Sequence, residues 1–132
     1  GNKGAVENNY ALRTYDDGSN EQLAFAFIVS AAEHARSSNT SGISLNNWHH
    51  VAATYDDVAN NIIFYIDGVL QSSEVNVDGD AENNSIIANN RIVDIGETED
   101  GTHFFPGLID EVRIYNRALS ADEIKKLYQM GR

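Results

Sequence analysis

The sequence predicts a single all-β domain, a two-sheet antiparallel sandwich with one short helix at its C-terminal end. Three observations predict this fold. The chain has 132 residues, which suits one domain with its own hydrophobic core. Short runs of β-branched and aromatic residues alternate with clusters of Asp, Asn and Gly, as strands alternate with turns. Asparagine supplies 15 of the residues, and it favours tight turns because it tolerates positive φ.

The predicted strands follow one another at the spacing of hairpins. Residues 10–15 and 23–29 flank a polar turn and form the first expected hairpin. Residues 62–70 contain two apolar runs joined by Asp67-Gly68, and a turn of this kind has positive φ at both positions and matches the twist of the strands. Further segments bring the expected total to at least seven strands, as in a sandwich. These are residues 30–47, expected as a strand and a polar loop although they also permit a helical turn, and residues 48–55, 91–95 and 108–115, expected as strands.

The single helix is expected from residue 120 onward. Ser120 is a good N-cap, and Glu123 stands three residues later, so that each side chain can satisfy the backbone amide of the other in a capping box. Gly131 can cap the C-terminal end. An apolar face at helical spacing predicts that the helix packs back onto the sheets. This face consists of Ile124, Leu127 and Tyr128.

Composition and charge narrow the classes of function. Nine Lys and Arg against 20 Asp and Glu give a formal net charge of −11, which argues against nucleic acid and anionic membranes as partners because both need basic surfaces. The chain contains no cysteine, which excludes a disulfide scaffold and a zinc site with cysteine ligands. No apolar run reaches the roughly 18 residues of a transmembrane helix, so membrane insertion is not expected.

Three segments together resemble a known family. They are residues 48–56 (WHHVAATYD), residues 64–68 (FYIDG) and residues 105–120 (FPGLIDEVRIYNRALS). From roughly residue 9 to its end, the chain resembles the laminin-G-like jelly-roll domains, particularly the bacterial type, of the concanavalin A-like lectin/glucanase superfamily. The long phrase that ends in the capped helix is the most specific of the three.

The resemblance implies a jelly-roll sandwich over residues 1–132 and a non-catalytic binding module at an extracellular or cell-surface location, appended to a larger secreted enzyme or adhesin. Domains of this family usually carry further strands before the point where this chain begins. We therefore expect a partial or shortened domain that lacks N-terminal strands, and open sheet edges of this kind favour self-association. Carbohydrate, as glycan or polysaccharide, is the partner that the resemblance favours. A protein–protein adhesion or structural module without sugar binding is the alternative.

Catalysis is not expected. Glycoside hydrolases use two carboxylates that flank one sugar bond, and a pair on one strand must be separated by an even number of residues to share a face. Asp110 and Glu111 are adjacent, so they would point to opposite faces. The same argument makes His49 and His50 poor joint ligands of one metal ion, and a hydrogen-bonded residue at the edge of the core is the plainer interpretation of His50.

Asp110 is the best candidate for a metal ligand. On an alternating strand it shares a face with the apolar residues Leu108, Val112 and Ile114, where a carboxylate requires a cation or several amide donors. In relatives of the family, a carboxylate at this position often helps to hold a structural Ca²⁺ ion, and calcium prefers oxygen ligands. The alternative is that Asp110 accepts only hydrogen bonds.

Carbohydrate binding would use one face of a sheet. It needs aromatic rings for the apolar face of a sugar and charged or amide groups for the hydroxyls. The predicted sugar-binding residues are Tyr65, Arg113, Tyr115, Arg13 and Tyr15. The alternative is that Tyr65 and Tyr115 cover a second core layer, with Arg113 paired to Glu111. The acidic charge of the chain would repel acidic polymers, so neutral glycans fit better.

Overall fold

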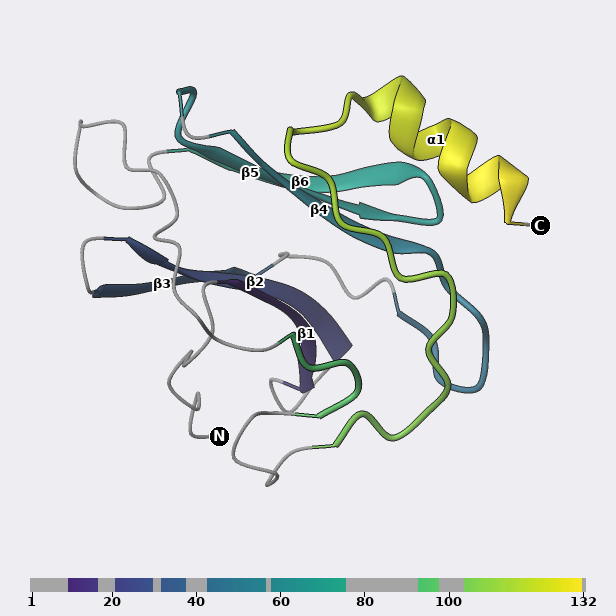
Figure 1. The fold of residues 1–132 in the computed structure, drawn as a ribbon. Coiled ribbons are helices and arrows are strands. Elements are labelled where there is room, and N and C mark those ends of the chain that lie inside the picture. Colours follow the sequence, from purple (N-terminus) through teal and green to yellow (C-terminus); the bar gives the residue numbers. More distant parts are fainter. Residues whose placement is uncertain are drawn as a thin grey trace.

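The computed structural model contains two three-stranded antiparallel sheets and one helix. In Figure 1 the two sheets lie one above the other, and the helix covers the outer side of the second sheet. The first sheet consists of β1 (Tyr10–Asp16), β2 (Glu21–Val29) and β3 (Ala32–Ser37), and the second of β4 (Val51–Asp56), β5 (Asn61–Ile66) and β6 (Val69–Val75), with helix α1 at Ala121–Met130. The structure describes residues 10–16, 21–29, 32–37, 43–56, 58–75, 93–97 and 104–131.

The main core lies between the two sheets. Ile62 and Phe64 are fully buried and Ile66 is 4% exposed, and Phe25 of β2 joins them from the first sheet. Successive side chains of a strand point to opposite faces, so this alternation turns one face of β5 toward the first sheet. The predicted two-sheet β-sandwich with one C-terminal helix is confirmed.

A second core lies between the outer face of the β4–β6 sheet and α1. Tyr65, on the face of β5 opposite to Phe64, is 2% exposed and packs with Leu119 and Ile124. Burial of an apolar side chain of this size contributes about 1.5–3 kcal/mol. The apolar face of the predicted helix therefore packs onto the sheet as its spacing indicated.

The predicted hairpins are present. Strands β1 and β2 pair antiparallel with Tyr10 opposite Phe27 and Asp16 opposite Glu21. Strands β5 and β6 are joined at Asp67 and Gly68, which have φ values of 53° and 73°, so the Asp-Gly turn has the predicted positive φ at both positions. Strand β3 also confirms the strand expected within residues 30–47, in place of a helical turn.

The capping of α1 is also confirmed. The backbone N–H of Glu123 donates to Ser120 Oγ at 3.3 Å, and the backbone N–H of Ser120 donates to Glu123 Oε2 at 2.9 Å. At the other end, the N–H of Gly131 donates to the carbonyl of Leu127 at 3.2 Å. Arg117 adds a two-pronged contact to the Glu123 carboxylate, with N–O distances of 2.7 and 2.9 Å. This guanidinium lowers the pKa of Glu123 from 4.5 to about 2.

Two of the expected strands are not formed within the described residues. Residues 93–97 contain only one isolated bridge, between Glu97 and Phe104, and residues 91 and 92 lie outside the described part. Residues 108–115 belong to no strand either. Glu111 has a φ of 52°, a left-handed conformation that interrupts the alternation of a strand. The prediction of a strand with a buried apolar face at this place is therefore wrong, and the described part of the chain contains six strands.

Candidate functional site

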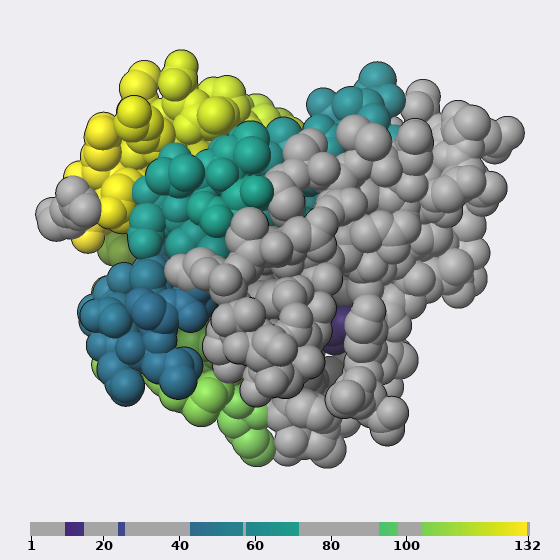
Figure 2. All heavy atoms as spheres, turned by 180° about the vertical axis from the view of Figure 1, so that it is seen from behind, coloured from purple at the N-terminus to yellow at the C-terminus, as the bar shows by residue number. Residues whose placement is uncertain are grey.

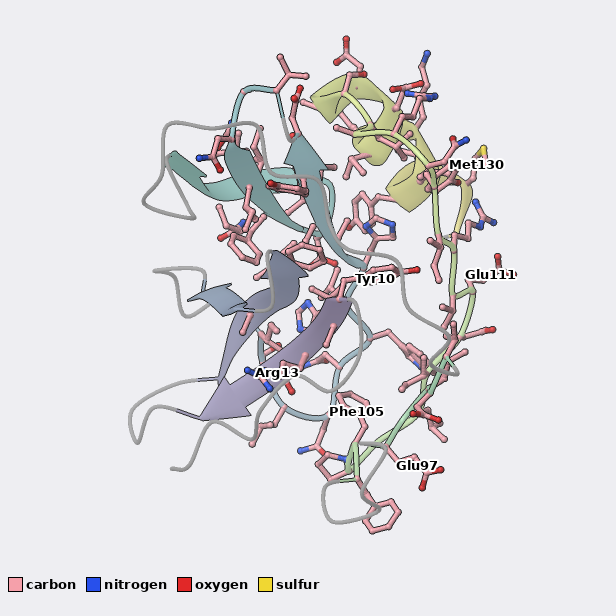
Figure 3. All side chains as sticks on the ribbon, turned by 60° about the vertical axis from the view of Figure 1, so that its left-hand side comes forward. Tyr10, Arg13, Glu97, Phe105, Glu111 and Met130 are labelled. Atoms are coloured by element: carbon pink, nitrogen blue, oxygen red, sulfur yellow. The ribbon has the colours of Figure 1, made fainter. Side chains whose placement is uncertain are left out.

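The residues best suited to recognition lie on the outer segment, which we define as residues 107–117. Arg113 Nη2 donates to Glu111 Oε2 at 2.6 Å, and Tyr115 lies close enough to the guanidinium to contribute to the raised pKa of Arg113. Figure 3 shows the segment along the side of the molecule, with the labelled Glu111 pointing outward. A carboxylate, a guanidinium and a phenol thus form one exposed cluster, the Glu111–Arg113–Tyr115 cluster.

Within this cluster, the positive charge of Arg113 and the negative charge of Glu111 compensate each other. The hydrogen bond to Glu111 is the largest cause of a raised pKa for Arg113, and the neighbouring Tyr115 is the next, so the guanidinium stays protonated. The side chains of Arg113 and Glu111 are 43% and 69% exposed. The cluster therefore offers hydrogen-bond donors and acceptors beside an aromatic ring, at a place that a ligand can reach.

The other predicted sugar-binding residues do not join this cluster. Tyr65 is buried under α1, so its role as a sugar platform is corrected to the alternative, a residue of the second core layer. Arg13 and Tyr15 lie on β1 of the first sheet, and Figure 3 shows Arg13 far from Glu111 in the view. Arg13 is half-buried, and the side chain of Tyr15 lies outside the described part of the structure.

Asp110 has a different environment from the one expected. Its side chain is exposed, and its Oδ1 accepts the N–H of the next residue, Glu111, at 2.8 Å. Leu108 and Val112, which were expected to form an apolar face around it, are 76% and 51% exposed. Asp110 therefore needs no cation to offset burial. Among the described residues, no group of three or more His, Asp or Glu side chains could hold a metal ion.

A hydrogen-bond network that sequence reasoning missed ties the loop before β4 to the β5–β6 turn. Ser44 Oγ lies 2.8 Å from His49 Nε2, and His49 Nδ1 lies 2.8 Å from Asp67 Oδ2. Asp67 also accepts the N–H of His50 on Oδ1 at 3.0 Å, and its own N–H donates to the His50 carbonyl at 2.8 Å. No local signal in the sequence indicates this contact, because it depends on the β4–β5 register: Val51 pairs with Ile66, so that the next position brings His50 beside Asp67.

The order Ser44–His49–Asp67 has the connections of a serine–histidine–aspartate triad, and the same contacts tie the loop before β4 to the β5–β6 turn. The backbone N–H of Ser44 also donates to His49 Nε2, at 3.2 Å. Nε2 is therefore the acceptor of the imidazole, and Nδ1 carries the proton toward Asp67. With the His49 side chain only 15% exposed, this network holds the loop in one conformation.

His50 lies close to both helix α1 and the outer segment. Its Nδ1 is buried and has no hydrogen-bond partner among the described residues, and its ring centroid is 6.1 Å from that of Tyr128 in α1. Burial is the largest cause of its lowered pKa; Asp67 opposes this shift, and the positive charge of Arg113 adds to it. His50 is therefore neutral at pH 7, and its surroundings include the guanidinium of the outer segment.

These features define a β-sandwich module with an exposed polar cluster beside its C-terminal helix. The model of one family, described as the concanavalin A-like lectin/glucanases superfamily and of the laminin G type, matches residues 2–125. The chain belongs to this family, as the resemblance of its motifs predicted. In the described part of the chain, the helix falls short of the length and apolarity needed to cross a bilayer.

One similar solved structure is the crystal structure of residues 221–444 of an S-layer domain-containing protein from Clostridium thermocellum. The identity is 23% and the TM-score is 0.46. The match covers 94% of this chain and 65% of that one, so the chain spans less than two thirds of the length of that structure. No curated protein matches the chain.

Proposed function

We propose that this chain is a non-catalytic module that binds neutral carbohydrate through the outer segment, as part of a larger protein that is secreted or held at a cell surface. The observation that carries the proposal is the Glu111–Arg113–Tyr115 cluster, in which a 2.6 Å ion pair stands beside a half-exposed tyrosine. Sugar hydroxyls both donate and accept hydrogen bonds. A paired carboxylate and guanidinium can serve both roles, while the phenol ring covers the apolar face of a pyranose.

The charge of the chain supports a neutral ligand. The net charge is −11, and the guanidinium of the cluster is already neutralised by Glu111. A uronic-acid or sulfated polymer would meet repulsion over most of the surface without a strong local cation to offset it. Neutral hexose and pentose polymers carry no such penalty.

The absence of catalysis is part of the same proposal. Glu111 is held by Arg113, and Asp110 is held by the backbone next to it, so neither carboxylate is placed as an acid or base across a sugar bond. The Ser44–His49–Asp67 network is explained by its hold on the loop. We expect no turnover of glycans and no labelling of Ser44 by a fluorophosphonate probe. Labelling that disappears in Ser44→Ala would contradict a non-catalytic module.

Affinity electrophoresis in gels that contain neutral polysaccharides tests the proposed site. We expect retardation of the wild type, and a loss of affinity of about tenfold, the equivalent of one or two hydrogen bonds, in both Arg113→Ala and Tyr115→Ala. Lys126→Ala, an exposed cation on α1, and Tyr10→Ala, an exposed tyrosine of β1, are the matched controls and should bind as the wild type does. Equal losses in the controls, or no retardation by any neutral polysaccharide, would overturn the assignment.

A protein–protein adhesion module is the second candidate, because the outer segment also exposes apolar side chains. Leu108, Val112 and Ile114 are 76%, 51% and 58% exposed; where exposed apolar side chains form one continuous patch, they mark interaction sites. In this case sedimentation velocity should show self-association of the wild type that the combined change of these three residues to Ser abolishes. If the wild type is monomeric and is retarded by glycans, the carbohydrate-binding module is retained and the adhesion module is rejected.

The structural Ca²⁺ ion stays a prediction. It is supported by the position of Asp110 in the family-like phrase of the sequence, whereas the described residues offer only its single exposed carboxylate. Its test is the effect of calcium on thermal unfolding, given in the Discussion.

A further inference from the structure

The loop before β4 exposes the only tryptophan of the chain. Trp48 is 65% exposed, and Leu45 in the same loop is 72% exposed. Figure 2 shows residues 43–56 as a protruding corner of the molecule below α1. A tryptophan ring buries up to about 250 Å² when it is covered, so its exposure leaves a large apolar area in contact with water.

The loop is fixed on both sides of this ring. Asn47 donates from Nδ2 to Ser44 Oγ at 3.1 Å and to the carbonyl of Leu45 at 3.2 Å. His49, on the other side, is held between Ser44 and Asp67 at 2.8 Å each. The side chains before and after Trp48 are thus committed to the network, whereas the indole is left outside it. A ring on a fixed loop loses little further conformational entropy when a ligand covers it.

The chemistry around the ring indicates which ligand it can take. Residues 43–50 (ISLNNWHH) contain no Lys, Arg, Asp or Glu, so the loop offers no charged side chain to attract an ion. The exposed Asn46 has a φ of 62°, a left-handed conformation that asparagine tolerates. The indole offers an apolar plane, and the exposed amide of Asn46 lies two residues before it in the same loop; these match the two kinds of surface of a pyranose, its C–H face and its rim of hydroxyls.

We propose that Trp48 is the stacking platform of a second sugar subsite, which binds one residue of a neutral glycan against the indole while the Ser44–His49–Asp67 network holds the loop in place. This inference rests on the proposed function and extends it from the Glu111–Arg113–Tyr115 cluster to a second point of contact. His50, two residues after Trp48 in the sequence, is close enough to Arg113 for the positive charge of Arg113 to contribute to its lowered pKa. Two subsites favour a glycan chain over a single sugar, since the second contact is made without a further loss of translational freedom.

Tryptophan fluorescence tests the subsite without any variant, because Trp48 is the single tryptophan. A neutral oligosaccharide that binds should shift the emission to the blue and protect the indole from quenching by acrylamide. Binding seen by calorimetry with unchanged emission and unchanged quenching would overturn the Trp48 subsite and leave the proposed function intact. No binding by calorimetry of any neutral oligosaccharide or polysaccharide would overturn both.

Variants separate stacking from general loop effects. Trp48→Ala should weaken oligosaccharide binding about tenfold, the size expected of one ring-stacking contact, with unchanged far-UV circular dichroism. Leu45→Ala removes an equally exposed apolar side chain of the same loop and should bind within about twofold of the wild type. His49→Gln tests the positioning role: it should weaken binding of the oligosaccharide and make Trp48 easier to quench in the unliganded protein. Equal losses in Trp48→Ala and Leu45→Ala, or full affinity in Trp48→Ala, would overturn the subsite.

Discussion

The β4–β6 sheet and the outer segment are both rich in apolar residues, yet the structure buries one set and exposes the other. Ile62 and Phe64 have no exposed surface, whereas Leu108 and Ile114 are 76% and 58% exposed. Hydrophobicity is therefore not what separates the two regions. The difference lies in what each backbone can pair with.

The β4–β6 sheet forms from strands that are neighbours in the sequence. Strand β5 pairs with a neighbour on each side, and short turns make both connections. In the outer segment, the left-handed Glu111 interrupts the strand conformation, and no strand pairing is formed there within the described residues. The comparison indicates that the β4–β6 sheet holds the packed core, whereas the outer segment is the exposed region to which we assign the proposed recognition.

The largest expected effect separates the two regions by stability. Phe64→Ala should lower the free energy of unfolding by about 3–5 kcal/mol because it removes a fully buried ring and leaves a cavity. Val112→Ala, on the exposed segment, should change it by less than about 0.5 kcal/mol. Urea denaturation followed by circular dichroism gives both values. Similar losses in the two variants would show that the outer segment is part of the core after all.

A structural Ca²⁺ ion at Asp110 would stabilise the outer segment and leave the β4–β6 sheet unaffected. If Asp110 holds a structural ion, thermal unfolding should shift upward with added calcium, by the equivalent of about 2.7 kcal/mol at a hundredfold excess over the dissociation constant. EDTA should reverse the shift, and Asp110→Ala should abolish it, while Asp122→Ala on α1 keeps it. If neither calcium nor EDTA changes the thermal unfolding temperature, the structural ion at Asp110 is ruled out.

The parts of the fold that could be predicted from sequence are those whose signals are local. Asp67-Gly68 defines a turn because positive φ is required at two adjacent positions, and Ser120 with Glu123 defines a helix start because three residues separate two complementary side chains. Alternation in β5 also placed Tyr65 opposite to Phe64 correctly. Each of these signals needs no knowledge of the rest of the chain.

The parts that could not be predicted depend on neighbours far away in sequence. Alternation could not decide whether Tyr65 meets solvent or α1, since the answer comes from Leu119 and Ile124, more than 50 residues later. It predicted a strand at residues 108–115, because a pattern of side chains does not reveal whether a partner strand is present. The contact of His49 with Asp67 required the β4–β5 register. The pairing of Arg113 with Glu111, by contrast, lies within three residues and was one of the predicted alternatives.

The β4–β6 sheet and the outer segment also differ in the space around their glycines. Gly68 has a φ of 73°, and an added Cβ would lie 3.0 Å from Tyr128 Cδ1 and 3.4 Å from the backbone of Lys125. Gly68→Ala should therefore cost about 1–2 kcal/mol from the left-handed conformation alone, and loosen the contact with α1. At Gly107 the added Cβ would meet only the ring of the exposed Phe105, which can rotate away. Gly107→Ala should stay within about 0.5 kcal/mol of the wild type in denaturant unfolding; the reverse order would contradict the division into a packed and an exposed region.

The smallest expected effect measures how the two regions are coupled. The pKa of His50 is lowered, first by burial and further by the charge of Arg113, while Asp67 opposes the shift. Arg113→Ala should raise the pKa of His50 in an NMR titration, but leave it below 6.5 because burial remains the main cause. Since the folded protein binds the proton less readily than the unfolded chain, stability should fall as the pH drops below about 6.5 toward the folded pKa. This acid loss should be smaller in Arg113→Ala than in the wild type and unchanged in Lys126→Ala. An unshifted His50 titration in Arg113→Ala would show that the outer segment is electrically independent of the β4–β6 sheet.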